Sequence, residues 1–107
     1  MKIFEITSFL EQIAPLAYQE SYDNSGLIVG DLNADIKQAL VSLDCTKTII
    51  DEAIAHNCNL IIAHHPIVFS GLKKIIGKNY VERVIIKAIQ NNIAIYAIHT
   101  NLDSVLN

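Results

Sequence analysis

Cysteine is scarce in this 107-residue sequence, and so is any excess of charge of one sign. The two cysteines, Cys45 and Cys58, show no Cys-x-x-Cys spacing and no cysteine framework. We interpret both as reduced, mostly buried thiols, because free cysteine commonly packs as a small hydrophobic side chain. The 8 basic and 11 acidic residues give a net charge of −3 without a block of like charge. Electrostatic capture of nucleic acid or of an anionic membrane is therefore not expected.

Signals for export, membrane insertion and nucleotide binding are also missing. The first residues lack the basic-then-apolar order of a signal peptide, and the longest apolar runs are far shorter than a membrane span. There is no G-x-x-x-x-G-K loop and no G-x-G-x-x-G motif, so a nucleotide fold of either kind has no support. We expect a cytoplasmic protein that does not associate with membranes.

The composition is that of one globular domain, because 51% of the residues are hydrophobic and the length allows a modest core. Near the start, Thr7 or Ser8 is expected to cap a helix that runs to about Tyr18, with Pro15 either kinking the helix or ending it early. A strand over 27–30 is followed by a turn over 31–35, and we expect that strand to pair with the next one as a hairpin. The apolar positions of the first helix are Phe9, Leu10, Ile13, Ala14 and Ala17.

From residue 36 onward, the pattern alternates between strands and helices. Strands are predicted over 36–43, from 60, and over 92–98. One helix starts at Thr46 or Thr48 and a second at Asn79. This order predicts parallel strands joined by right-handed crossovers, and hence an α/β fold with a mixed, mostly parallel sheet flanked by helices. The predicted inner faces of the two helices are Ile49, Ile50, Ala53 and Ile54, and Val81, Val84, Ile85, Ala88 and Ile89.

Candidate metal ligands follow two of these strands. The apolar run from Leu60 leads into His64 and His65, and Pro66 forces the backbone to leave the sheet at this point. Two imidazoles at such an exit could face two neighbouring metal ions, or one metal ion and a substrate. The spacing is equally compatible with structural histidines that hydrogen-bond to loop carbonyls.

The last strand ends in the sequence His-Thr-Asn-Leu-Asp, and parallel strands place their carboxyl ends at one edge of a sheet. Asp103 is therefore a candidate ligand, because a carboxylate can bridge two metal ions. We favour a supporting or structural role for His99 over a ligand role. Asp44 ends another strand, where it could orient a histidine or cap the next helix.

Lysines on the loop after the histidines could bind phosphates, although a solvated loop carries the same residues. They are Lys73, Lys74 and Lys78. His56 receives no functional role. Asp23 and Asn24 fall in a turn, where such residues commonly make only local hydrogen bonds.

Four segments, in order, resemble the N-terminal lobe of the Nif-three-like family, whose bacterial members are commonly labelled GTP cyclohydrolase type 2 homologues. Together these segments cover essentially the whole chain. Departures inside them are small: Tyr22 stands where the family has an aromatic residue, often tryptophan. The serious departure is the missing second lobe. The chain stops shortly after its last matching segment, so we expect residues 1–107 to be one lobe of a two-lobe protein whose C-terminal lobe is absent here. The segments are 22–27, 42–46, 63–73 and 99–103.

The resemblance implies a dinuclear metal centre between two α/β lobes. In it, His64, His65 and Asp103 match the N-terminal ligands, and His99 would be a catalytic residue that supports proton transfer. The remaining ligands, a histidine and a glutamate, would lie in the absent lobe. The resemblance also implies two divalent ions per full-length subunit, either zinc, iron or manganese, and a ring-shaped homohexamer. The implied reaction is hydrolytic opening of the imidazole ring of GTP, with release of formate.

Two other functions remain compatible with the sequence. One is a non-catalytic interaction or regulatory domain whose metal, if any, is structural. The other is an unrelated phosphoesterase, which ranks last because such a site needs more aspartates than Asp44 and Asp103. The isolated 107-residue chain is expected to bind metal weakly and to show little or no turnover, since it holds only half of the dinuclear ligand shell that the resemblance implies.

Overall fold

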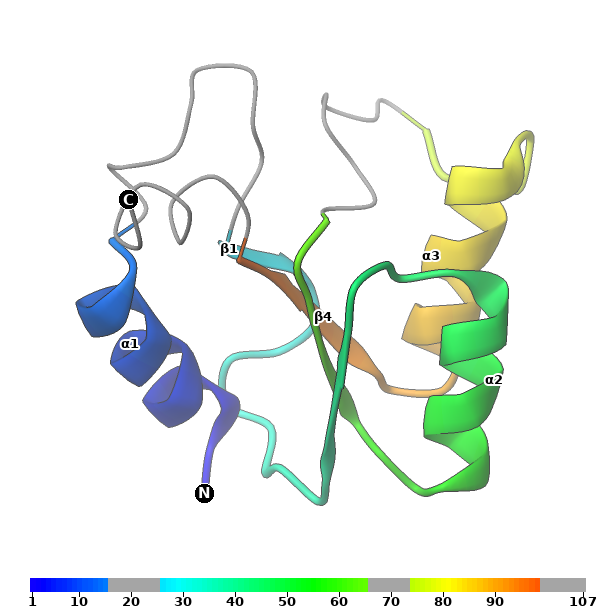
Figure 1. Ribbon diagram of the computed structural model, residues 1–107. Coiled ribbons are helices and arrows are strands. Elements are labelled where there is room, and N and C mark those ends of the chain that lie inside the picture. The colour runs from blue at the N-terminus through cyan, green and yellow to red at the C-terminus, as the bar shows by residue number, and fades with distance from the viewer. Residues whose placement is uncertain (16–25, 66–73, 99–107) are drawn as a thin grey trace.

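A computed structural model describes residues 1–15, 26–65 and 74–98, and it shows a four-stranded sheet between helices. Figure 1 places one helix on the left of the sheet and two helices on the right. No helix among these three ranges is long and apolar enough to cross a membrane. The elements are α1 (Ile3–Ile13), β1 (Gly26–Val29), β2 (Ala39–Ser42), α2 (Lys47–Ala55), β3 (Leu60–Ala63), α3 (Tyr80–Gln90) and β4 (Ala94–Ala97).

The sheet has the order β1-β4-β3-β2. Strand β3 lies parallel to both β2 and β4, whereas β1 runs antiparallel to β4. The predicted mixed, mostly parallel sheet is therefore confirmed. Strand β4 is buried over its whole length, as expected for a central strand with helices on both faces.

Helices α2 and α3 cover one face of the sheet, and their start residues were predicted correctly. The Thr46 hydroxyl accepts from the Ile49 N–H at 3.3 Å, and the Asn79 side chain accepts from the Glu82 N–H at 2.9 Å. The buried residues of this layer include Ile50, Ala53, Val84, Ile85 and Ala88. Two residues predicted to be buried, Ile54 and Ile89, are exposed. Each follows a buried alanine, Ala53 or Ala88, and one residue turns the side-chain direction by about 100° around the helix axis.

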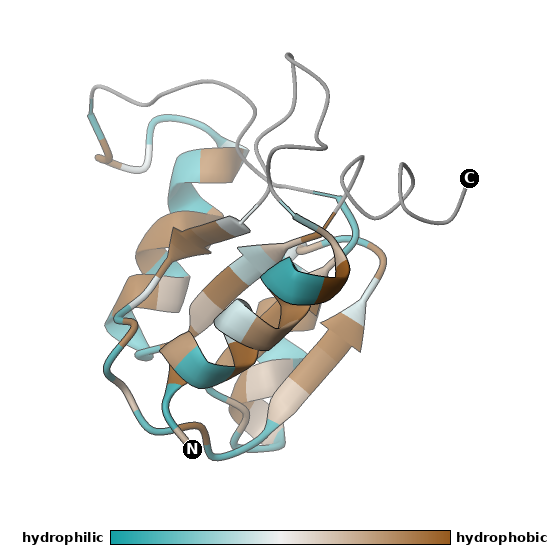
Figure 2. Cartoon of the chain, turned by 90° about the vertical axis from the view of Figure 1, so that its left-hand side faces the viewer, coloured by the Kyte–Doolittle hydropathy of each residue, from teal (hydrophilic) through white to brown (hydrophobic). Residues whose placement is uncertain are grey.

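Helix α1 covers the other face, but its predicted start is wrong. The helix begins at Ile3, and the Glu5 carboxylate accepts from the Lys2 N–H at 3.0 Å, which satisfies one of the free donors of the first turn. Ile3 and Thr7 are buried, whereas Phe9 and Ile13 are exposed. The helix ends at Ile13 instead of near Tyr18, so of the two effects predicted for Pro15 the early end is the one observed. Figure 2 shows α1 in front of the hydrophobic strands that it covers.

The predicted hairpin is also wrong, because β1 and β2 lie at opposite edges of the sheet. The segment between them pairs instead with the start of the chain: the Ile3 N–H donates to the Ala34 carbonyl at 2.9 Å, and the Ile36 N–H donates to the Met1 carbonyl at 2.7 Å. These bonds lead the chain across the sheet, so β1 is free to pair with β4. The strand predicted over 36–43 forms only over Ala39–Ser42.

Candidate metal centre

The two histidines follow β3 at the edge where the three parallel strands end. The His64 N–H donates to the Ser42 carbonyl at 3.2 Å, and the His65 N–H donates to the Leu43 carbonyl at 2.9 Å. The backbone therefore keeps its pairing with the β2 side of the sheet for two residues beyond β3. This pairing fixes the positions of both histidine Cα atoms.

The ring of His64 is held from the β4 side. Its Nδ1 lies 2.9 Å from the Ile98 carbonyl oxygen, just beyond the end of β4. A carbonyl oxygen can only accept, so Nδ1 carries the proton and the lone pair of the neutral ring is on Nε2. A metal ion would bind at that nitrogen.

The ring of His65 is held from the β2 side. Its Nδ1 lies 2.6 Å from Oδ1 of Asp44, and both side chains are partly exposed. The carboxylate accepts from Nδ1–H, which again leaves the lone pair of the neutral ring on Nε2. A histidine whose far nitrogen donates to a carboxylate or a carbonyl is the usual arrangement around a metal ion. Of the two roles predicted for Asp44, orientation of a histidine is the one observed, because Thr46 caps α2.

The two rings lie together at this edge, with their centroids 5.1 Å apart and their planes tilted by 41°. Two neutral imidazoles are suitable ligands for zinc, iron or manganese, so the residues present fit a divalent ion. Within the described ranges no group of three or more His, Cys, Asp or Glu residues could hold a metal ion. The predicted ligand Asp103 and the predicted catalytic residue His99 lie outside the described residues, so their roles remain predictions.

The Ile98 carbonyl is the contact that the sequence did not reveal. Any residue can offer a backbone carbonyl, so no residue type signals this role.

Cys45, next to Asp44, is not a ready ligand, because burial raises the pKa of its thiol to about 11 and metal ions bind the thiolate form. Cys45 and Cys58 are both free and buried, as predicted.

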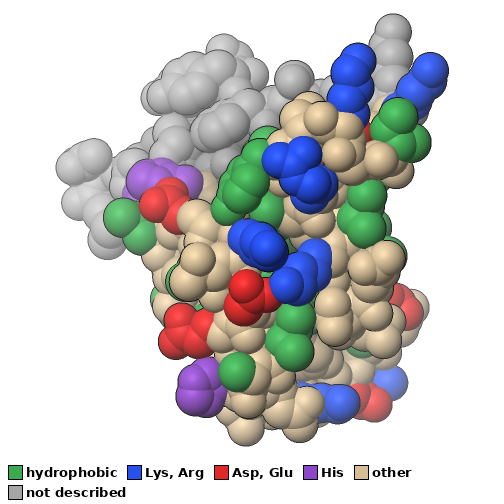
Figure 3. Space-filling model, turned by 90° about the vertical axis from the view of Figure 1, so that its right-hand side faces the viewer, with side chains coloured by type: hydrophobic (Ala, Val, Ile, Leu, Met, Phe, Trp, Pro, Cys, Tyr) green, Lys and Arg blue, Asp and Glu red, His purple; other side chains and the backbone are tan. Residues whose placement is uncertain are grey.

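The lysine loop is anchored by a buried acid. The Glu82 carboxylate accepts from the N–H groups of Ile76 and Lys78, at 3.1 and 3.2 Å. Lys74 and Lys78 are exposed, whereas Lys73 lies outside the described residues. Figure 3 shows Lys and Arg side chains spread over this side of the molecule, with Asp and Glu side chains among them. The exposure of Lys74 and Lys78 fits the solvated loop that the sequence favours, and phosphate binding by these lysines stays the untested alternative.

The anchored loop leads to a prediction about acid stability. The backbone N–H of Ile76, followed by that of Lys78, lowers the pKa of Glu82 below its ordinary value of 4.5. Glu82 therefore stabilises the fold above pH 4.5, and this stabilisation is lost as the pH falls through the lower, folded-state pKa. In urea unfolding from pH 7 to pH 3, Glu82→Gln should be less stable than the wild type at pH 7 and should converge with it in acid. Glu52→Gln controls for the loss of a negative charge. A difference in unfolding free energy between Glu82→Gln and the wild type that stays the same from pH 7 to pH 3 would contradict the prediction.

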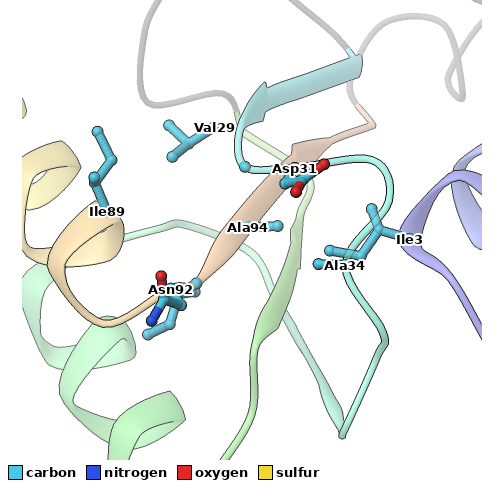
Figure 4. A pocket seen from close by; sticks show the side chains of 9 residues that line it. Ile3, Val29, Asp31, Ala34, Ile89, Asn92 and Ala94 are labelled. Carbon is cyan, nitrogen blue, oxygen red and sulfur yellow. The ribbon is translucent and has the colours of Figure 1, made fainter.

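A cavity of about 330 Å³ lies at the other end of the sheet (Figure 4). Ala94 begins β4 and Asn92 precedes it, so the cavity is at the amino end of that strand, away from the histidines. Its lining is mostly apolar, and the Asp31 carboxylate already accepts from the Asn33 N–H at 2.9 Å. The chemistry of the donor atoms therefore favours the histidine edge as the candidate site.

Comparisons with known proteins give a consistent result. The profile of the Duf34/NIF3 family (NGG1p interacting factor 3) matches residues 1–107. A curated relative from Clostridium acetobutylicum, named GTP cyclohydrolase 1 type 2 homolog, is 47% identical over 105 residues, which are 98% of this chain and 39% of the relative. The chain thus spans about two fifths of the length of this relative.

Two solved structures share the fold. A Bacillus cereus protein related to NIF3 has a TM-score of 0.88 and 42% identity, over 96% of this chain and 28% of the other. Reduced HcgD from Methanocaldococcus jannaschii has a TM-score of 0.86 and 33% identity, over 96% of this chain and 41% of the other. Since the family profile matches from the first residue to the last, the chain belongs to the Duf34/NIF3 family.

Proposed function

We propose that this chain contributes His64 and His65 as metal ligands to a GTP cyclohydrolase-like hydrolase that uses two divalent ions, either zinc, iron or manganese. The observation that carries the proposal is the anchoring of the two rings. The Ile98 carbonyl holds His64, and the Asp44 carboxylate holds His65, each through Nδ1. Rings fixed in this way present Nε2 without the entropy cost of ordering a mobile side chain.

The residues of the chain divide into ligands and positioning groups. Asp44 and Ile98 orient the rings, whereas Asp103 would complete the ligand set and His99 would support proton transfer. When bound, a divalent ion would supply Lewis acidity and would lower the pKa of a coordinated water toward neutrality.

The substrate class is supported by the name of the Clostridium acetobutylicum relative, GTP cyclohydrolase 1 type 2 homolog. Hydrolytic opening of the imidazole ring of GTP, with release of formate, is therefore the reaction we propose for the whole protein. Since the chain spans 39% of that relative, the remaining ligands and the proposed homohexamer would depend on further residues. We expect the 107-residue chain alone to bind metal weakly and to release little formate.

The first experiment titrates the purified chain with Zn²⁺, Fe²⁺ and Mn²⁺ by calorimetry and then assays formate release from GTP with each metal. Saturable metal binding with little formate release is the expected result. Chain that binds none of the three ions would overturn the proposal and would favour a non-catalytic interaction domain. Micromolar or tighter binding of two ions per chain would contradict our expectation of an incomplete ligand shell.

Removal of the Asp44 carboxylate is a more specific test. Asp44→Ala should weaken metal binding by about 10–100-fold, because the ring of His65 loses the group that orients it. Asp44→Asn should have a smaller effect, since its amide oxygen can still accept from Nδ1–H. Asp51→Ala is the matched control, because Asp51 pairs with Lys87 on the outer surface of α2 and α3. Equal losses in Asp44→Ala and Asp51→Ala would point to a general charge effect instead of ring orientation.

A further inference from the structure

Basic residues are unevenly distributed along the chain. Six of the eight lysines and arginines lie between residues 47 and 87, together with only three of the eleven acidic residues. Figure 3 shows the Lys and Arg side chains on the side of the molecule formed by α2, α3 and the loop before α3. The chain as a whole carries a net charge of −3, so this side is basic on an otherwise acidic molecule. A surface of this kind attracts anions.

Few acidic side chains neutralise this basic side. Asp51 is paired with Lys87, and the buried Glu82 carboxylate is occupied by backbone N–H groups of the loop. The ammonium groups of three exposed lysines form no ion pair among the residues that the structure describes, and we call these three the lysine surface. They are Lys47, Lys74 and Lys78.

The loop that carries Lys74 and Lys78 is held in one conformation. The Glu82 carboxylate accepts from two backbone N–H groups of this loop, at 3.1 and 3.2 Å. The Arg83 guanidinium donates to the Gly77 carbonyl at 3.4 Å. A ligand that binds the lysines therefore has to order only their side chains, because the backbone beneath them is already fixed.

The start of α2 is joined to the start of α3 beside this loop. The Lys47 N–H donates to the Tyr80 hydroxyl at 2.8 Å. Since the hydroxyl accepts this bond, its own hydrogen is left to donate, and the described part of the chain offers no acceptor for it. Lys47 is three residues after Asp44, which holds His65, so the Cα atoms of Lys47 and Asp44 are at most about 11 Å apart. The lysine surface therefore begins at the histidine edge.

We propose that the lysine surface and the Tyr80 hydroxyl bind the triphosphate of a nucleotide whose base lies at the histidine edge. This inference rests on the proposed function, because that function makes a nucleoside triphosphate the substrate. Phosphate oxygens carry negative charge and accept hydrogen bonds, whereas ammonium groups and a hydroxyl donate them. Binding of the triphosphate here would orient the imidazole ring of the base toward His64 and His65.

The small size of the basic area favours a single nucleotide over a nucleic acid. Nucleic-acid-binding domains carry a wide basic face that follows many successive phosphates. Here most of the acidic residues lie outside the 47–87 segment, so a long polyanion would also meet the acidic remainder of the chain. Three lysines and one hydroxyl match the few phosphates of a nucleotide.

Inorganic triphosphate, titrated into the purified chain without divalent metal, tests the site apart from any reaction. In two-dimensional amide NMR spectra, the amides of residues 47 and 74–83 should shift and saturate, whereas those of residues 57–59, at the opposite end of the sheet, should not. GTP should shift the same amides, and guanosine, which has no phosphate, should not. Affinity should fall several-fold when NaCl is raised from about 20 to about 200 mM, because exposed charges are screened.

A double variant tests the lysine side chains. Lys47→Gln/Lys74→Gln removes two cations and keeps the bond to Tyr80, which uses the backbone N–H of residue 47. It should weaken the binding of inorganic triphosphate by about tenfold, the effect expected for two exposed charge pairs. Lys2→Gln/Lys37→Gln is the matched control, because it removes the same charge away from the lysine surface, and it should leave the affinity unchanged.

Three results would overturn the inference: absence of saturable shifts at these amides, equal loss of affinity in the two double variants, and tighter binding of a short oligonucleotide than of GTP. The last result would assign the surface to nucleic acid. Failure here is distinguishable from failure of the proposed function. Chain that binds divalent metal but no triphosphate would overturn this inference alone, whereas chain that binds triphosphate but no metal would overturn the proposed metal centre and support the lysine surface.

Discussion

Replacement of Gly30 by alanine is expected to destabilise the fold by about 2–6 kcal/mol. Gly30 has a φ of +129°, which side-chain-bearing residues rarely adopt and which costs about 1–3 kcal/mol. An added Cβ would also lie 2.5 Å from the Cβ and 2.9 Å from the Cα of Ala94. Because Ala94 is on the buried strand β4, relief of this overlap would shift the sheet and cost about another 1–3 kcal/mol. The melting temperature should fall by roughly 10 °C or more.

Gly77→Ala is the matched control for Gly30→Ala. Gly77 has a φ of +79°, but a Cβ there would meet only Ile86 and Arg83 side-chain atoms at 3.6 and 3.7 Å, which is ordinary contact. It should therefore cost only the backbone term, about 1–2 kcal/mol. In a double-mutant cycle, Ala94→Gly should recover part of the loss in Gly30→Ala. Equal destabilisation by the two glycine variants, in urea or thermal unfolding, would show that contact with Ala94 is unimportant.

Loss of either histidine ring is expected to weaken divalent-metal binding by more than about 100-fold. Loss of a group that only orients a ligand costs about 10–100-fold, and loss of the ligand itself removes the whole coordinate bond. His64→Ala and His65→Ala should each show this effect in a calorimetric Zn²⁺ titration. Since both side chains are partly exposed at the end of β3, neither variant removes a core contact, and thermal unfolding should verify that both are folded.

His56→Ala is the control for His64→Ala and His65→Ala. His56 is the exposed C-cap residue of α2, whereas Asp44 and Thr46 precede the other end of that helix, next to the histidine edge. Its removal should leave Zn²⁺ affinity unchanged. If His56→Ala weakens binding as much as His64→Ala does, the ion is binding nonspecifically to surface imidazoles. Unchanged affinity in both His64→Ala and His65→Ala would remove the proposed centre altogether.

Much of the candidate site was predictable, because strand ends and helix caps are local features. The run from Leu60 to Ala63 predicts a strand from its own residues, and Thr46 and Asn79 predict caps from their side-chain oxygens. Parallel order then follows from the alternation of strands and helices, and it places Asp44 at the same edge as His65. The contact between Asp44 and His65 could be anticipated for this reason. The sequence could not show that Asp44 orients the histidine instead of capping α2.

The errors arose where distant segments compete for the same backbone groups. Hydrogen bonds from the start of the chain to the 31–36 segment replaced the expected hairpin, and the same contacts moved the beginning of α1 to Ile3. Ile54 and Ile89 fit a helical apolar pattern, yet they are exposed, whereas the alanines that precede them, Ala53 and Ala88, are buried. None of these outcomes can be read from residue spacing.

The sequence by itself determined the types of most elements, the parallel core and the positions of His64 and His65 at the end of a strand, since each depends on residues near in sequence. Only the tertiary structure decided that β1 pairs with β4, that β1 and β2 lie at opposite ends of the described strand order, and that the Ile98 carbonyl holds a histidine ring. The reason is that backbone N–H and C=O groups are chemically alike at nearly every residue, so packing of the whole chain selects which of them meet.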